Sequence, residues 1–176
     1  AFIWLTALII IRPRGNFPLN DDWSFGRTVK HFVEYHEFAP WSWSAMPLVT
    51  NTFWGALFCL PSGFSFDALR ISTLVAALLG MLAVYKLVKM SRAPEWLAVM
   101  AALVLGFNPI FFPLSYTFMT DVLFITVCVL ASIFLLRNLQ SGKNSDLFIG
   151  TALVVLGILS RQLALAVPFG FAIVSC

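Results

Sequence analysis

Long apolar stretches, interrupted by a few charged residues, make up most of this chain. Helical spans can be drawn near Asp67–Met90, Glu95–Pro113 and Asp121–Arg137, and another begins near Asp146. A helix needs about 20 mostly apolar residues to cross a bilayer. The chain is 60% hydrophobic and 11% charged, with a mean hydropathy of +0.91, which is unusual for a water-soluble domain. The sequence therefore predicts an all-α, polytopic membrane helical bundle.

The first and last residues also fall inside apolar runs. Residues 1–11 are too few to span a bilayer alone, and they lack the small-residue cleavage site of a signal peptide. We expect them to be the end of a truncated first helix in the N-terminal part of a longer protein, with about five transmembrane helices in this part. Residues 1–176 would form a single membrane module, and residues 12–66 would be its first outer loop, which carries interfacial helices.

Lysine and arginine gather at two short turns between the predicted spans. They are Lys86, Lys89 and Arg92 at one turn, and Arg137 and Lys143 at the other. Because positive charge favours the cytoplasmic side, both turns are predicted to lie inside. The motifs "NDDW" (20–23) and "FMTD" (118–121) then share the outer side, provided that residues 46–60 lie in the interface or re-enter. Arg12 and Arg14 are exceptions, since this scheme puts them outside.

The segment Asp21–Tyr35 is predicted to be an amphipathic interfacial helix, because its apolar side chains recur at helical spacing. They are Phe25, Val29, Phe32 and Val33. We expect this helix to lie flat on the outer leaflet. In residues 46–60 a further helix is expected to open at Pro47, since proline is tolerated in a first helical turn.

Three charged positions at the predicted outer level need an explanation. They are the adjacent pair Asp21 and Asp22, then Asp121, and Arg161. Ionisable groups at membrane depth are costly, so they are usually paired or functional. Arg161 lies about 22 Å along a helix that starts near Asp146, at 1.5 Å per residue, which puts it near the outer end. The sequence thus predicts that two acidic positions and one guanidinium meet in one site.

Each of these residues also has a purely structural interpretation. Asn20 could cap the interfacial helix, with the acidic pair complementing the helix dipole, and Thr120 and Asp121 could do the same for their helix. Arg161 could extend to the lipid headgroups or hold helices together.

Aromatic residues and one further ion pair have structural interpretations too. The six tryptophans favour an aromatic belt at the membrane interfaces, although Trp41 and Trp43 could stack on a sugar. Asp67 and Arg70, three residues apart, are typical of an ion pair on a helix surface.

Four segments, in this order and spacing, resemble a known superfamily. They read "NDDWSFGRTVKHF", "MPLVTNTFWGALFCLPSGFSFDALRIST", "NPIFFPLSYTFMTDVLF" and "LSRQLALAVPFGF". The chain is similar to the glycosyltransferase C superfamily, and more closely to the dolichyl-phosphate-mannose protein mannosyltransferase-like proteins, which include the bacterial aminoarabinose lipid A transferase. The resemblance covers essentially the whole chain, as the N-terminal part of such an enzyme.

The resemblance implies roles for individual residues. Such enzymes carry an acidic pair in the first outer loop, matched by Asp21 and Asp22, and a further acid at the outer start of the fourth helix, matched by Asp121. These three are the expected catalytic acids. In many members a basic residue of the fifth helix contacts the lipid phosphate, and Arg161 stands at that place.

Two further residues are assigned to substrate binding with that arginine. Gln162 follows it, in the position of a small residue in several relatives, and Trp23 follows the acidic pair. Where the family often shows Lys-Pro-Pro-Leu, this chain reads "AMPL", Ala45–Leu48.

The predicted function is that of an inverting glycosyltransferase, which moves a sugar from a polyprenyl-phosphate donor to an acceptor hydroxyl on the outer, periplasmic or lumenal, face. Asp21 is the preferred base for the acceptor hydroxyl. Arg161 would bind the departing phosphate through its planar guanidinium. Asp121 could orient the acceptor or raise the basicity of Asp21. The sequence has no Gly-rich phosphate loop, which argues against a nucleotide-sugar donor.

The expected partners are the lipid-linked donor, the bilayer, and a glycan, lipid or protein acceptor, but not nucleic acid, because the basic residues are scattered. A bacterial inner membrane location is expected. No metal is assigned, although a divalent cation could bind the three aspartates. Two other functions stay open: a transporter or lipid-linked-sugar flippase, and a structural subunit of a membrane complex.

Overall fold

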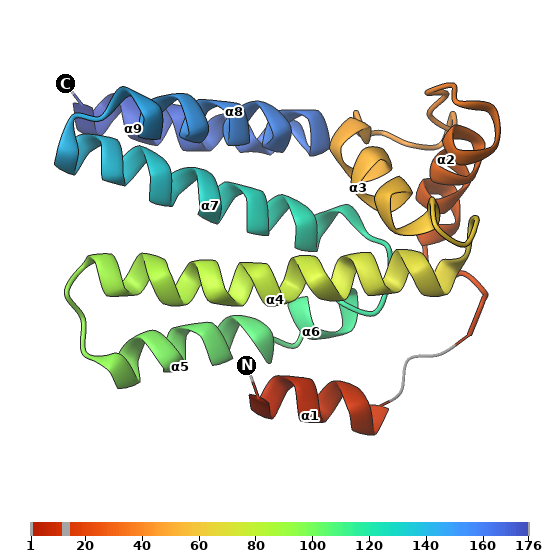
Figure 1. The fold of residues 1–176 in the computed structure, drawn as a ribbon, viewed down its shortest axis with the longest axis horizontal. Coiled ribbons are helices and arrows are strands. Elements are labelled where there is room, and N and C mark those ends of the chain that lie inside the picture. The colour runs from red at the N-terminus through yellow and green to blue at the C-terminus, as the bar shows by residue number, and fades with distance from the viewer. Residues whose placement is uncertain (1, 12–14, 176) are drawn as a thin grey trace.

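Apolar helices run side by side along the long axis of the molecule (Figure 1). The structure is a computed structural model that describes residues 2–11 and 15–175, and these residues form helices and loops without a strand. Arg12 and Arg14 lie outside the described residues. The helices are α1 (Phe2–Ile11), α2 (Asp22–Tyr35), α3 (Val49–Cys59), α4 (Phe66–Met90), α5 (Glu95–Gly106), α6 (Phe111–Leu114), α7 (Thr120–Ser141), α8 (Asn144–Ser160), the 3-10 helix η1 (Gln162–Leu165) and α9 (Ala166–Ser175).

The two ends of the molecule carry different elements (Figure 1). One end, called the turn end below, holds the α4–α5 and α7–α8 turns. The opposite end, called the α2–α3 end, holds α2, α3, the starts of α4 and α7 and the end of α8. Both basic turns therefore lie at one end and the motifs at 20–23 and 118–121 at the other, while the side of the membrane that each end faces stays a prediction. At the turn end, Lys89 pairs with Glu95 at 3.1 Å and Arg137 pairs with Asp146 at 3.4 Å.

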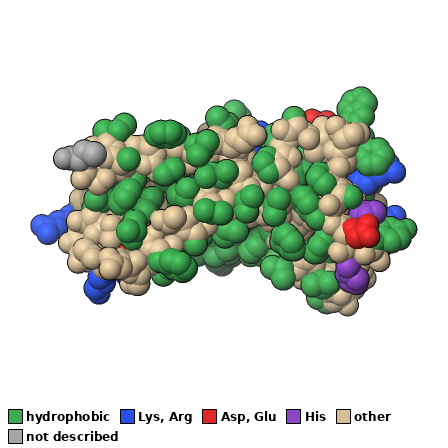
Figure 2. Space-filling view, turned by 90° about the horizontal axis from the view of Figure 1, so that it is seen from above, with side chains coloured by type: hydrophobic (Ala, Val, Ile, Leu, Met, Phe, Trp, Pro, Cys, Tyr) green, Lys and Arg blue, Asp and Glu red, His purple; other side chains and the backbone are tan. Residues whose placement is uncertain are grey.

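Two of the described helices are long and apolar enough to cross a membrane, namely α4 with 25 residues and α7 with 22. Helices α1, α5, α8 and the η1–α9 segment are apolar but shorter. Hydrophobic side chains cover most of one face of the molecule, and charged side chains are concentrated toward its two ends (Figure 2). The predicted all-α membrane bundle is confirmed, and the number of spans stays a prediction.

Helices α4 and α7 approach each other closely because small residues line their contact. Ala76 and Ala77 are fully buried there, and the Thr126 hydroxyl donates a hydrogen bond to the Ala76 carbonyl at 2.9 Å. A Cβ added at Gly80 would lie 2.5 Å from the Thr126 hydroxyl oxygen. Small residues at such crossings let helix backbones pack tightly inside membranes.

Two predicted spans end earlier than expected. The span Glu95–Pro113 is wrong as one helix, because α5 stops at Gly106 and the Asn108 side chain then accepts hydrogen bonds from the backbone N–H groups of Ile110 (2.9 Å) and Phe111 (3.1 Å). This side-chain cap and Pro109, which has no N–H, start a new turn. The last span stops at Ser160, where Arg161 is extended with φ −146° and ψ 133°.

The apolar side of α2 contacts protein rather than a leaflet. Phe25 and Val29 pack in a buried cluster with residues of α3 and α4, including Ala56 and Leu69. The amphipathic helix was predicted correctly, and its position flat on the outer leaflet stays a prediction. Pro47 does not open a helix either, since α3 begins at Val49, after a left-handed Leu48 with φ 56°.

Two tryptophans belong to the core and not to an aromatic belt. The Trp4 indole is fully buried and donates to the Gly106 carbonyl at 3.0 Å, which joins α1 to α5. The Trp54 indole donates to the Ser72 carbonyl at 3.0 Å. Both indole N–H groups thus have the partner that burial demands. By contrast, Trp43 and Trp96 are exposed, as a belt requires.

Arg70 pairs with Asp67 as predicted, but the prediction that this pair lies on the helix surface is wrong, because Arg70 is buried. Its guanidinium contacts Asp67 at 3.4 Å and donates to the carbonyls of Gly15 and Phe17. The Asp67 carboxylate accepts from the Gly15 N–H at 3.0 Å. The pair therefore holds the segment before α2 against the start of α4.

Candidate functional site

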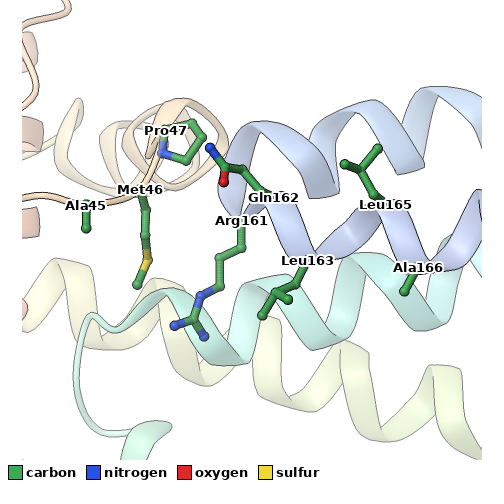
Figure 3. Close-up of a pocket in the computed structure, with 8 residues that line it drawn as sticks. All are labelled: Ala45, Met46, Pro47, Arg161, Gln162, Leu163, Leu165 and Ala166. Atoms are coloured by element: carbon green, nitrogen blue, oxygen red, sulfur yellow. The ribbon is translucent and has the colours of Figure 1, made fainter.

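An ion pair joins the start of α7 to the break after α8. The Arg161 guanidinium donates through Nη1 to Oδ1 of Asp121, which lies in the first turn of α7. Both side chains are partly exposed, at 22% for Arg161 and 28% for Asp121. Because the backbone of Arg161 leaves the helix at this point, its side chain points toward α7 (Figure 3).

Helix α3 fixes the end of α8 on which Arg161 depends. The Ser160 hydroxyl donates to Oδ1 of Asn51 at 2.6 Å, and both residues are buried. One turn earlier, the Thr50 hydroxyl donates to the Leu156 carbonyl at 2.6 Å. These contacts hold the residue before Arg161 in place, which limits where the guanidinium can reach.

A cavity of about 460 Å³ opens beside this arginine. It is lined by Ala45, Met46, Pro47, Arg161, Gln162, Leu163, Leu165 and Ala166. Ala45, Met46 and Pro47 form one side, opposite the side that carries Arg161 and Gln162 (Figure 3). The side chains that line it are apolar except for one guanidinium and one amide, so an anion that entered would meet a single cation.

Asp22 is fully buried and ties α2 to the loop before α7. Its Oδ1 accepts from the Leu19 N–H at 2.7 Å and its Oδ2 from the Phe118 N–H at 3.3 Å. Burial raises the pKa of the Asp22 carboxyl above its usual value, although both backbone hydrogen bonds and the Arg70 charge act in the opposite direction. The like charge that contributes to this rise is Asp21. Asp22 thus joins the motifs at 20–23 and 118–121.

Asp21 has a different environment from its neighbour. It is exposed, it occupies the N-cap position of α2, and its side chain makes no capping hydrogen bond. The interpretation that Asn20 caps this helix is therefore wrong. Thr120 does not cap α7 either, because Met119 is at the N-cap and the Thr120 hydroxyl contacts the Met46 sulfur at 3.2 Å.

The structure gathers some of the predicted site residues and separates others. Arg161 and Gln162 line one cavity, Asp121 is paired with Arg161, and Asp22 is bound to the loop that leads to Asp121. None of the three predicted acids is among the residues that line that cavity. Trp23 lines a second hollow of about 510 Å³, together with other residues of α2 and with Phe64 and Phe66. The catalytic and binding roles of all six residues stay predictions.

Sequence reasoning missed several residues that shape the site. Asn51 and Ser160 are polar residues within apolar helices, and this contrast was a usable signal. Met46 and Pro47 stand in the stretch that takes the place of the family's Lys-Pro-Pro-Leu, but the sequence did not show that they lie across from Arg161. Among the described residues, no group of three His, Cys, Asp or Glu is arranged to hold a metal ion.

Comparison with known proteins completes this picture. A family model for dolichyl-phosphate-mannose-protein mannosyltransferases matches residues 46–175, which include α3 through α9 and all residues that line the Arg161 cavity except Ala45. No curated protein and no solved structure matches the chain. The matched residues are most of the chain, and the membrane-capable helices α4 and α7 lie inside the match. The chain therefore belongs to the dolichyl-phosphate-mannose-protein mannosyltransferase family of membrane glycosyltransferases, which use a lipid-linked sugar donor.

Proposed function

We propose that this protein is an inverting glycosyltransferase that transfers a sugar from a polyprenyl phosphate to an acceptor hydroxyl. The reaction takes place on the outer face of the membrane, which in a bacterium is the periplasmic face of the inner membrane. The observation that carries this proposal is the guanidinium of Arg161 in a mostly apolar cavity at the end of membrane-spanning helices. An amphiphile with one phosphate and a long apolar chain has the matching chemistry.

Arg161 binds the donor phosphate in this proposal. A guanidinium offers several N–H donors in one plane and matches two phosphate oxygens at once. Met46, Pro47 and Leu163 put apolar side chains beside the guanidinium, which suits a donor that carries an apolar chain next to its phosphate. The Gln162 amide, on the same side of the cavity, supplies an uncharged donor to the phosphate or the sugar.

Asp21 acts as the base. Its carboxylate is exposed and makes no capping bond, so it is free to reach an acceptor hydroxyl, whereas Asp22 is buried and already bound to two backbone N–H groups. The acceptor oxygen forms a bond to the anomeric carbon as the bond from that carbon to the phosphate oxygen breaks. The acceptor proton passes to Asp21, and the lipid phosphate leaves with the electron pair. Attack from the opposite face inverts the anomeric configuration.

The acceptor is a hydroxyl of a glycan, a lipid or a protein. Residues 12–66 form the outer loop that brings Asp21 to the reaction, and the hydrogen bond from Phe118 to Asp22 supports this geometry because it ties the loop to the start of α7. Positive charge at the turn end, with Lys86, Lys89 and Arg137, supports a cytoplasmic location for that end.

Replacing Arg161 by glutamine in the full-length protein tests this function. Transfer of a radiolabelled sugar from a polyprenyl-phosphate donor is measured in proteoliposomes. We expect kcat/KM to fall by about 10²–10³-fold, as when one donor to a developing anion is removed. Arg137→Gln is the matched control, since Arg137 also pairs with an aspartate but at the turn end. Equal transfer by the Arg161→Gln and Arg137→Gln variants would contradict the proposal.

A further inference from the structure

The cation in the Arg161 cavity already has a partner. Arg161 is the one charged residue among the cavity's lining residues, and its guanidinium is bound to the Asp121 carboxylate. The facing wall of Ala45, Met46 and Pro47 supplies no second cation. An anion that enters the cavity must therefore compete with Asp121 for the same positive group.

The substrate and product of the proposed reaction differ in charge at this position. The donor is a phosphate diester with one negative charge. The lipid phosphate that leaves is a monoester, and such a group carries about −1.5 to −2 near pH 7. An arginine without a counter-ion would consequently hold the product more tightly than the donor, and product release would be slow.

We propose that Asp121 is a built-in competitor that sets the affinity of Arg161 for phosphate and drives release of the lipid phosphate. This inference rests on the proposed function. When the donor binds, its phosphate displaces the carboxylate from part of the guanidinium. After transfer, the carboxylate returns, and the ion pair seen in the structure forms again as the product leaves. Asp121 is thus a positioning residue, because it acts through Arg161.

The surroundings of the pair support an exchange of partners rather than a static bridge. Arg70 shows what a structural arginine looks like in this protein: it is 2% exposed and bound to two backbone carbonyls as well as to Asp67. Arg161 is 22% exposed and lies at the edge of a cavity. Its contact with Asp121 can therefore open without uncovering a buried core.

The backbones that carry the two groups are fixed independently. Asp121 is in the first turn of α7, and Arg161 follows Ser160, which is held by Asn51. Opening the pair needs only side-chain rotation. An ion pair whose partners are held in this way re-forms readily, which is the property that a competitor for the product requires.

Binding of a short-chain polyprenyl phosphate, the product analogue, tests the inference. The dissociation constant is measured for the full-length protein in detergent, with Asp121→Asn, Arg161→Gln and the double variant. We expect Asp121→Asn to bind at least about tenfold more tightly, because a neighbouring carboxylate at ion-pair distance is worth that much at a partly exposed site. In the Arg161→Gln background the same change is expected to have much less effect on the dissociation constant, because the guanidinium for which Asp121 and the phosphate compete is then missing.

Asp146→Asn is the matched control, because Asp146 also pairs with an arginine but lies at the turn end. It is expected to leave the dissociation constant unchanged. Transfer kinetics give a second readout: Asp121→Asn should show a burst of transfer followed by slow turnover, with stronger inhibition by added polyprenyl phosphate.

The outcomes separate this inference from the proposed function. If Arg161→Gln weakens binding but Asp121→Asn does not tighten it, the competitor role is wrong and the phosphate site remains. If Asp121→Asn tightens binding equally with and without Arg161, the effect is a general charge effect and the inference is also wrong. If wild-type protein and Arg161→Gln bind the lipid phosphate alike, the proposed function itself fails, and the competitor role fails with it.

Discussion

Adjacent residues of the same type have different tasks at the start of α2. Asp22 is fully buried and accepts two backbone hydrogen bonds, while Asp21 is exposed and makes no capping bond. The sequence identified the pair but could not divide the roles, because the division depends on the Phe118 N–H, a backbone group that is distant in the chain. Residue types predict chemistry, and three-dimensional contacts decide which of two equivalent groups is free to perform it.

The proposed base predicts a selective loss of activity. Asp21→Asn should lower kcat for transfer by about 10²–10⁴-fold, which is the usual contribution of a positioned acid or base. Binding of polyprenyl phosphate and the melting temperature should stay at wild-type values, since the Asp21 side chain is exposed. Wild-type turnover by this variant in a radiolabelled-sugar transfer assay would exclude Asp21 as the base.

The raised pKa of the buried Asp22 carboxyl predicts that the stability of the protein depends on pH. Because the folded-state pKa of Asp22 is raised, the folded protein binds more protons at this group than the unfolded chain does. Its contribution to stability is therefore fully present below the unfolded value of 3.8 and is lost as pH rises through the folded pKa. The difference in unfolding free energy, wild type minus Asp22→Asn, should fall across this window. Denaturation in detergent at several pH values measures it, and a difference that rises with pH would contradict the assignment.

At the scale of elements, the length of the apolar stretches predicted the long helices correctly but not the ends of the shorter ones. The predicted spans 67–90 and 121–137 agree closely with α4 and α7. The predicted end of α5 was wrong because the Asn108 side chain starts a new turn, and the expectation that Arg161 lies within the last helix was wrong because its backbone is extended. Apolar composition alone does not show such breaks, since apolar residues continue on both sides.

The contact between α3 and α8 predicts an effect on donor binding. Ser160→Ala removes the hydroxyl that binds Asn51 and leaves a buried amide oxygen without this donor, which costs about 1–3 kcal/mol. We expect KM for the donor to rise more than kcat falls, because Arg161 loses its fixed position. The control is Ser132→Ala, whose hydroxyl only bonds the carbonyl one turn back in α7. Equal kinetics for both variants would count against a positioning role for α3.

The tight α4–α7 crossing predicts that alanine at Gly80, which lies in the crossing, lowers stability, whereas alanine at Gly170 in α9 does not. Gly80→Ala should destabilise the protein, because overpacking costs about 1–3 kcal/mol and exceeds the roughly 1 kcal/mol that alanine gains in helix propensity. Gly170→Ala should be neutral or stabilising, since no heavy atom lies within 4 Å of the added Cβ. Thermal unfolding in detergent compares them, and a Gly80→Ala variant as stable as Gly170→Ala would show that the crossing tolerates more volume.

At the scale of the whole molecule, charge predicts the arrangement better than amphipathicity does. The distribution of lysine and arginine correctly put both turns at one end and the acidic motifs at the other (Figure 1). The apolar side of α2 was also recognised, but its pattern could not show that α3 and α4 cover it instead of lipid. The spacing of apolar residues along a helix reveals which side is apolar, but it does not reveal what packs on that side.

The proposed orientation predicts which loops a membrane-impermeant thiol reagent reaches. In a background without native cysteines, Ser42→Cys lies in an exposed loop at the α2–α3 end and Ser91→Cys lies in an exposed turn at the opposite end. In intact cells we expect labelling at position 42 only, and labelling at both positions once the membrane is permeabilised. Labelling of position 91 alone in intact cells would show that the protein has the opposite orientation to the one proposed.

The central claim is that the Arg161 cavity binds the phosphate of a lipid donor. A structure of the full-length protein with polyprenyl phosphate bound tests it most directly. The account predicts the phosphate within hydrogen-bond distance of the Arg161 guanidinium, in the cavity walled by Met46 and Pro47, with the contact to Asp121 opened. A phosphate bound elsewhere, with Arg161 still paired to Asp121, would contradict it.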